Sequence, residues 1–178
     1  MSFRDRLLAI AGAPSPPVTR LTPDAGGVDG RRGCWYLAAM QEELEAIVEE
    51  FGAETGSIHL LEDGLLRLKA QVGLAPRIVR VVESVPVGKG MAGLAAERNE
   101  PVSTCNIQAD ESGDIPSGAK LTGVNGAIVV PIRGDAGEVR GTLGIGVFRP
   151  YDYSPKEVSR LLELGRTLAA APIRGRAD

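Results

Sequence analysis

The segment from Val87 to Asn106 constrains the fold of this chain more than any other part of the sequence. It reads VGKGMAGLAAERNEPVSTCN, in which closely spaced glycines precede a short run of small and apolar residues. Glycine permits the positive φ angles of tight turns, and small side chains let a helix pack closely. Asn99 and Pro101 end this run, because neither favours the interior of a helix. The segment therefore predicts a turn, a short helix and then a strand.

Apolar residues at helical spacing predict a long helix near each end of the domain. The first helix is expected to end at Gly52 and Gly56, and its apolar residues are Leu37, Met40, Leu44, Ile47, Val48 and Phe51. The second begins after Ser154-Pro-Lys-Glu157, which has the residues of a capping box with proline at the first helical position. Its apolar face comprises Val158, Leu161, Leu162, Gly165, Leu168 and Ala169.

Two hairpins are expected between these helices. Residues 57–62 and 65–72 flank Asp63-Gly64, a dipeptide typical of two-residue hairpin turns. Residues 128–132 and 141–148 form the second pair, around the turn at residues 134–137.

The last predicted strand has two different faces. Leu143, Ile145 and Val147 share one face, whereas Gly144 and Gly146 leave the other nearly bare. Glycine in a strand often marks a place where another backbone or a ligand approaches closely. We therefore expect a helix or a ligand against the glycine face.

This order of elements predicts an α+β domain on an antiparallel sheet. Each long helix has one apolar stripe to bury, so both helices are expected on one face of the sheet. Residues 74–125 are left for the other face, where we expect a lid of loops and short helices over a pocket. Within this segment, residues 77–83 fit either a helical turn or an extended connector.

The domain boundaries follow from the distribution of proline and glycine. Residues 13–33 are rich in both and predict a linker with little to bury. We expect a short N-terminal helix and this linker over residues 1–33, one domain over residues 34–173, and a tail over residues 174–178.

Composition argues against several classes of protein. A net charge of -3 lacks the basic footprint expected of nucleic-acid binding. The apolar runs are too short for a membrane helix or a secretory signal, so we expect no membrane association and a cytoplasmic location. The two cysteines, Cys34 and Cys105, lie far apart, which argues against a disulfide framework and structural zinc.

These motifs together resemble the GAF domain family over residues 35–171. Phe51-Gly-Ala-Glu-Thr-Gly56 is similar to the segment before the family's first strand, and Gly88, Gly90 and Gly93 match the glycine pattern before its small helix. That pattern also occurs in dinucleotide-binding sites, but these need a parallel βαβ unit, which the flanking elements here do not provide. The resemblance implies a GAF/PAS-like fold and a signalling module that senses a small molecule or binds a partner protein.

The candidate ligand-binding residues lie in and around the expected lid. Val102, Thr104 and Asn106 share strand parity, and Asn125 precedes a central strand. Asn106 stands where family members often carry an aspartate, and it fits a loop-start cap as well as a pocket residue. The expected ligand contacts are Met91, Thr104, Asn106, Asp110 and Asn125.

The identity of the ligand and of any cofactor is not determined by these residues. Some relatives of the resembled family bind cyclic nucleotides through a spaced motif that includes an Asp-Glu pair. Asp110-Glu111 is present here, but the lysine and the phenylalanine of that motif are missing. The sequence therefore argues against a cyclic nucleotide.

Enzymatic readings centre on Cys105 and His59. Free methionine sulfoxide reductases, which are GAF-like, use several cysteines in the lid and small helix, whereas this chain has Met91-Ala92 in that helix and no resolving cysteine near Cys105. We expect Cys105 to be a small buried side chain, His59 to be a sheet histidine bonded to its neighbours, and the protein not to be an enzyme. A thiol redox enzyme remains the alternative function.

Assembly is expected to involve the terminal helices. In the first helix Leu37, Met40, Leu44, Ile47 and Phe51 are spaced like a coiled-coil seam. We expect a homodimer through these helices, consistent with the resemblance. Two alternatives stay open: both apolar stripes are used within the monomer, or the module serves dimerisation alone and holds no ligand.

Overall fold

The computed structural model describes residues 30–107 and 123–170. Contacts divide the chain into two units, Met1–Tyr36 and Leu37–Asp178, and the sheet belongs to the second. Helix α2 (Gly30–Glu50) crosses this division and begins inside the segment expected to be a linker. The expected N-terminal helix, the rest of the linker and the C-terminal tail lie outside the described residues.

The centre of the fold is one antiparallel sheet of six strands in the order β3-β2-β1-β6-β5-β4. Its expected hairpins are present, and Asp63 and Gly64 both have positive φ, 51° and 79°, as a two-residue hairpin turn requires. The α+β class and the antiparallel sheet predicted from the sequence are confirmed. The strands are β1 (Thr55–Glu62), β2 (Leu65–Val72), β3 (Ser84–Pro86), β4 (Val102–Thr104), β5 (Gly126–Arg133) and β6 (Val139–Val147).

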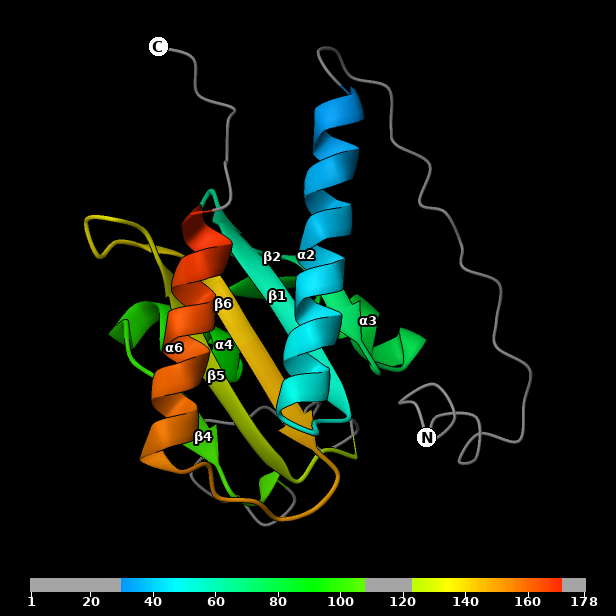
Figure 1. Cartoon of the computed structure of the whole chain (residues 1–178), viewed down its shortest axis with the longest axis vertical. Coiled ribbons are helices and arrows are strands. Elements are labelled where there is room, and N and C mark those ends of the chain that lie inside the picture. Colours follow the sequence, from blue (N-terminus) through cyan, green and yellow to red (C-terminus); the bar gives the residue numbers. More distant parts are fainter. Residues whose placement is uncertain (1–29, 108–122, 171–178) are drawn as a thin grey trace. The chain divides into compact units, whose positions relative to one another are not determined.

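Helices α2 and α6 (Pro155–Ala170) lie side by side over one face of the sheet, as expected (Figure 1). Close approach is possible because Gly56 of β1 has no side chain. A Cβ atom there would lie 2.6 Å from Val48 Cγ2 and 3.0 Å from Leu44 Cδ1. The main core between sheet and helices includes Ile58, Ile128, Val130, Leu143 and Leu161, all almost fully buried.

The capping box at the start of α6 forms as predicted. Ser154 Oγ accepts a hydrogen bond from the Glu157 amide at 3.4 Å, and the Ser154 amide donates to Glu157 Oε2 at 2.8 Å. These bonds satisfy backbone groups that a helix start otherwise leaves unpaired. The Ser154 hydroxyl bond, followed by that of Tyr151, lowers the pKa of Glu157.

The short helices α3 (Pro76–Val82) and α4 (Gly90–Arg98) cover the opposite face of the sheet (Figure 1). Residues 77–83, which the sequence left open, are therefore mostly helical. Helix α4 ends at Asn99, which adopts the left-handed conformation with φ 51°. Arg133 of β5 holds this end, because its Nε donates to Asn99 Oδ1 at 2.8 Å and a second guanidinium nitrogen donates to the Asn99 carbonyl.

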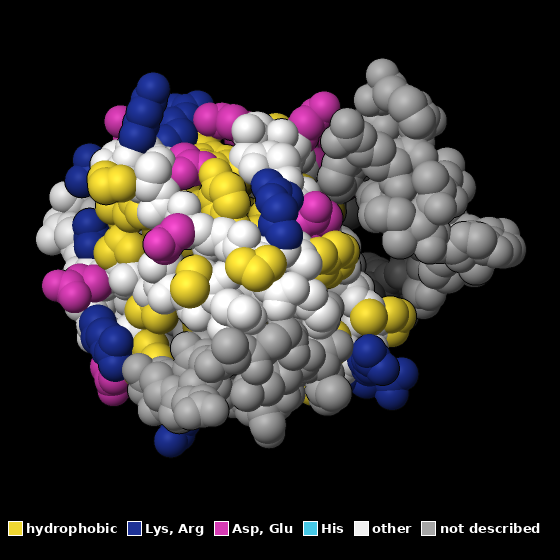
Figure 2. Space-filling model, turned by 90° about the horizontal axis from the view of Figure 1, so that it is seen from below, with side chains coloured by type: hydrophobic (Ala, Val, Ile, Leu, Met, Phe, Trp, Pro, Cys, Tyr) yellow, Lys and Arg dark blue, Asp and Glu magenta, His cyan; other side chains and the backbone are white. Residues whose placement is uncertain are grey.

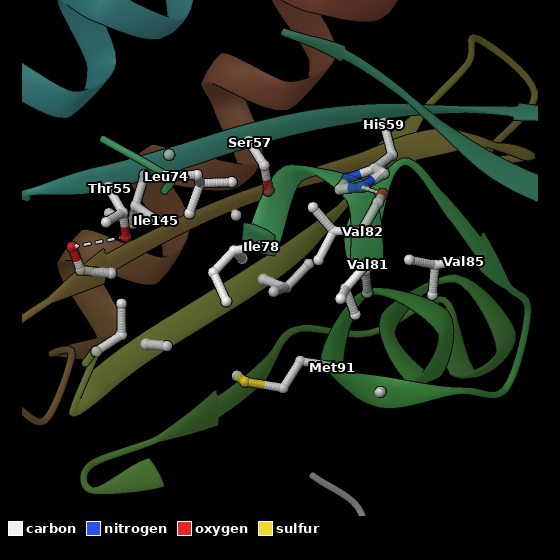
Figure 3. A pocket seen from close by; sticks show the side chains of 18 of the residues that line it. Thr55, Ser57, His59, Leu74, Ile78, Val81, Val82, Val85, Met91 and Ile145 are labelled. Atoms are coloured by element: carbon white, nitrogen blue, oxygen red, sulfur yellow. Dashed lines mark hydrogen bonds between the residues drawn. The ribbon is translucent and has the colours of Figure 1, made fainter. Parts of the chain in front are cut away.

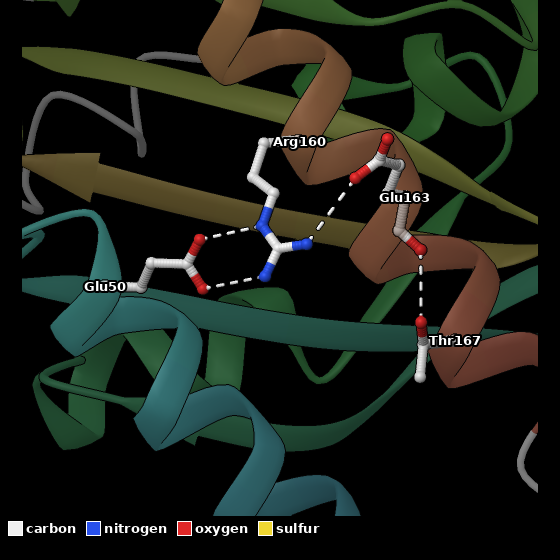
Figure 4. Close-up of polar contacts among 4 residues, drawn as sticks. All are labelled: Glu50, Arg160, Glu163 and Thr167. Carbon is white, nitrogen blue, oxygen red and sulfur yellow. Dashed lines mark hydrogen bonds and ion pairs between the residues drawn. The ribbon is translucent and has the colours of Figure 1, made fainter.

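An exposed ion-pair network joins the two long helices (Figure 4). The guanidinium of Arg160 in α6 contacts both carboxylate oxygens of Glu50 in α2, at 2.8 and 3.3 Å, and it reaches Glu163 at 3.5 Å. The Arg160 bond is the main cause that lowers the pKa of Glu50. Exposed pairs of this kind are screened by solvent and contribute little to stability.

Most of the apolar seam on which the dimer expectation rests is used within the chain. Met40, Leu44 and Ile47 of the seam, and Val48 beside it, are at most 2% exposed, whereas Leu37 is 44% exposed. Figure 2 shows a different face, seen from below, where basic, acidic and apolar side chains are intermixed. The homodimer stays a prediction, and Leu37 is the most exposed of the seam residues.

Candidate functional site

A cavity of about 340 Å³ lies on the sheet face opposite α2 and α6 (Figure 3). Strands β1, β5 and β6 form its floor, and α3, β3 and the first turn of α4 form its walls. Volumes of this size are typical of small-molecule sites. The cavity therefore lies where the sequence placed a pocket under a lid.

The floor of the cavity consists of alternate residues of two central strands. Thr55, Ser57 and His59 of β1 lie opposite Gly146, Gly144 and Thr142 of β6, and directly opposed residues share one face of a sheet. A Cβ atom on Gly144 would lie 3.2 Å from Val129 Cγ2 and 3.3 Å from Ser57 Oγ. The bare glycine face predicted for β6 thus leaves space that the cavity occupies.

The walls of the cavity are mainly apolar. Helix α3 contributes Ile78, Val81 and Val82, and Figure 3 shows Met91 of α4 across the cavity from them. Met91 also packs against a small buried cluster of Ile107, Val124 and Ala127, and these three residues line the cavity as well. The arrangement suits a ligand whose body is apolar.

His59 joins the floor of the cavity to the wall above it. The residue is 3% exposed, and its Nε2 lies 2.8 Å from the carbonyl oxygen of Val82. Because a carbonyl only accepts, Nε2 carries the proton in this bond. Burial lowers the pKa of His59, and the Val82 bond opposes this by a smaller amount. The prediction of a sheet histidine bonded to its neighbours is confirmed, and the structure adds that its ring lines the cavity.

Among the described lining residues, the titratable side chains are His59 and Lys89, and both are bases. Lys89 is exposed and is the N-cap residue of α4, with no side-chain capping bond. No group of three or more potential metal ligands occurs within the described part of the chain.

The expected ligand contacts are only partly brought together. Met91 lines the cavity, but Thr104, Asn106 and Asn125 are not among its described lining residues. Thr104 has the expected parity, because it pairs with the lining residue Ala127, yet it lies on the edge strand β4. The Asn125 amide group donates to the Phe148 carbonyl at 2.8 Å. Ile107 and Val124 occupy the wall instead, and ligand contact by these three polar residues stays a prediction.

Asp110, the remaining expected ligand contact, lies outside the described residues. Cys105 corrects a prediction, because it is exposed rather than buried. It directly follows β4, which is an edge strand of the sheet that the described residues form. Cys105 is also absent from the described lining of the cavity.

Several lining residues were not identified from the sequence. Thr55, Ser57 and the residues of α3 were missed, although a signal was present in β1. There the small polar residues Thr55 and Ser57 share the parity of His59, while Ile58 and Leu60 occupy the other. When one face of a strand carries small polar residues that pair with glycines, that face of the sheet has little side-chain cover and can form the floor of a cavity.

The model of the GAF domain family matches residues 38–171. No curated protein matches the chain. Within the described residues, no helix is long and apolar enough to cross a membrane.

Solved structures with the same fold include proteins of different function. The GAF domain of a phosphoenolpyruvate-protein phosphotransferase from Coxiella burnetii is 24% identical, with TM-score 0.66, over 76% of this chain and 80% of that one. A type II free methionine-R-sulfoxide reductase from Thermoplasma acidophilum is 21% identical, with TM-score 0.65, over 77% of this chain and 92% of that one. At these identities the likeness shows the fold alone.

Proposed function

This chain belongs to the GAF domain family, and we propose that its domain is a sensor that binds a small, largely apolar molecule and reports binding to a signalling partner. The observation that carries the proposal is the cavity of about 340 Å³ on the sheet face opposite the long helices. Its apolar walls supply binding energy through burial, and its few polar groups supply orientation.

The position of the cavity supports a reporting role. Thr55 lines the cavity and donates from Oγ1 to the Gly146 carbonyl at 3.3 Å. The preceding residue, Glu54, bonds the same carbonyl through its amide and accepts from the Phe148 amide through its carboxylate. Since α2 ends at Glu50, a ligand against Thr55 lies close to the segment that positions this long helix.

Filling the cavity tests the proposal. Ala92 lines the cavity from α4, and Ala92→Trp places a large side chain at its wall. Ala46 is exposed on α2, so Ala46→Trp is a matched control away from the cavity. Freshly purified protein is examined by native mass spectrometry for a bound molecule, and p-xylene is titrated as an apolar probe with thermal unfolding as readout.

We expect a bound molecule, or an increase of melting temperature with p-xylene, in the wild type and in Ala46→Trp. Both signals should be lost in Ala92→Trp. Equal signals in Ala92→Trp and Ala46→Trp, with both variants folded, would show that binding does not take place in this cavity.

We propose that the chain is not an enzyme, in contrast to the thiol redox alternative. A catalytic thiol must contact the bound substrate, whereas Cys105 is not among the described residues that line the cavity. Turnover of free methionine sulfoxide with a thiol reductant is the test. Activity that disappears in Cys105→Ser would establish the alternative instead.

A further inference from the structure

Among the polar side chains that line the cavity, His59 is a ring base whose one N–H is already engaged. The carbonyl of Val82 holds the Nε2 proton, so the neutral ring carries its lone pair on Nδ1. Among the described residues, no hydrogen bond to Nδ1 is found, and Nδ1 is not one of the fully enclosed side-chain atoms without a partner, so it is open to the cavity although the side chain is only 3% exposed. An acceptor that faces a cavity and is not bonded within the described chain is placed to accept a hydrogen bond from a donor on a bound molecule.

The protonation of His59 strengthens this reading. Burial lowers its pKa, which keeps the ring neutral at and above neutral pH. A neutral ring with its donor already engaged presents an acceptor alone. The group that it recognises must therefore be a donor.

From this geometry we propose that the ligand is a neutral apolar molecule with one O–H or N–H donor, and that His59 Nδ1 accepts from that donor. The proposal rests on the proposed ligand-binding function and adds the chemical class of the ligand. A phenol or a small alcohol has this chemistry, because its apolar body fits walls such as Ile78, Val82 and Met91. In this assignment His59 determines specificity, and the apolar walls provide most of the affinity.

Thr142 is a candidate donor to Nδ1 inside the chain. It lies directly opposite His59 on β6, it is fully buried, and its hydroxyl has no hydrogen-bond partner among the described residues. Thr142 does not belong to the described lining of the cavity. The test must therefore separate a ligand donor from the Thr142 hydroxyl.

The test compares p-cresol with p-xylene, which differ by a hydroxyl in place of a methyl group. Binding to the full chain is measured by calorimetry at pH 8 in wild type, His59→Leu and Thr142→Val. A hydroxyl that enters an apolar cavity without a partner binds worse than a methyl group. Binding of p-cresol at least as tight as that of p-xylene therefore indicates a partner.

We expect p-cresol to bind at least as tightly as p-xylene in the wild type and in Thr142→Val. In His59→Leu the affinity for p-cresol should fall about tenfold or more, while that for p-xylene changes much less. Tighter binding of p-xylene by the wild type overturns the assignment, and so does a preference for p-cresol that appears only in Thr142→Val. Failure of both probes to bind would also remove support for the proposed function, whereas equal loss of both in His59→Leu would contradict the inference alone.

A second measurement does not depend on any variant. The chain has one histidine, so the ¹⁵N signals of its imidazole are assigned without ambiguity in protein that lacks a histidine tag. Addition of p-cresol should shift the Nδ1 signal in the direction of an accepted hydrogen bond, and p-xylene should leave it in place. An Nδ1 signal that is unchanged by bound p-cresol would refute the contact.

Discussion

The imidazole of His59 donates from Nε2 to the carbonyl oxygen of Val82 at 2.8 Å and so connects the floor of the cavity to α3 above it. His59 belongs to a central strand, and Val82 is the last residue of α3. Residues 23 positions apart are thus joined at the cavity itself. A change at His59 is expected to affect both the stability of the fold and the cover of the cavity.

The first prediction concerns the dependence of stability on pH. Burial lowers the pKa of His59 in the folded chain, whereas in the unfolded chain it stays near its ordinary value of 6.5. Between these two values the unfolded chain binds more protons, so the free energy of unfolding falls as pH falls through this window. We expect a slope of up to about 1.4 kcal/mol per pH unit from this one group.

The matched control for this prediction is His59→Gln, which keeps an N–H donor for Val82 and does not titrate. The difference in unfolding free energy between wild type and His59→Gln is measured by denaturant titration from pH 8 to pH 5. Below pH 6.5 the wild type should lose unfolding free energy relative to His59→Gln as the pH falls. A difference that is constant across this range would mean that His59 is not buried as a neutral ring.

The second prediction concerns the C-terminal end of α4. Arg133 donates to the side chain and the carbonyl of Asn99, and Asn99 Nδ2 donates to the Gly137 carbonyl at 3.1 Å. Arg133→Met leaves Asn99 Oδ1 and the Asn99 carbonyl without their charged donor. We expect a loss of about 1–2 kcal/mol in unfolding free energy and faster amide hydrogen exchange in α4. Arg140→Met is the control, since Arg140 pairs with the exposed Glu138 and should tolerate the change.

The third prediction concerns the start of α6. Ser154→Ala removes the hydroxyl that caps the Glu157 amide, so it should cost about 0.5–2 kcal/mol in unfolding free energy. Ser154→Thr keeps a capping oxygen and should retain most of that stability. Equal midpoints of chemical denaturation for Ser154→Ala and the wild type would show that the capping box does not stabilise the helix.

The fourth prediction separates the fold from the expected homodimer. Leu44 is fully buried against Gly56, so Leu44→Glu should unfold the domain rather than only dissociate it. Leu37 is 44% exposed, so Leu37→Glu should keep the circular dichroism spectrum of the wild type. Sedimentation equilibrium then tests assembly: we expect dimers in the wild type and monomers in Leu37→Glu. A wild type that sediments as a monomer of 18.7 kDa would refute the dimer.

Local patterns in the sequence were sufficient for the two long helices, the two hairpins and their faces, but they left α3 undecided. The apolar spacing before Gly52 and after Ser154 predicted both long helices, and Asp63-Gly64 predicted the first hairpin. These features depend on neighbours within a few residues, since turn geometry and helical periodicity are local properties. The bare face at Gly144 and Gly146 was visible for the same reason, and it predicted close approach by another group.

Local sequence patterns could not predict which residues line the walls of the cavity. Strand parity correctly placed Thr104 on the cavity side of the sheet. Only the strand order shows that β4 is an edge strand, which puts Thr104 away from the floor of the cavity. The exposure of Cys105 likewise became visible only in the fold. A histidine is a base wherever it stands in a sequence. The lowered pKa of His59, however, arises from burial, which requires the packed fold. Local periodicity therefore determined which residues form strands and helices, and tertiary packing decided which of them enclose the cavity, because the cavity is bounded by segments far apart along the chain.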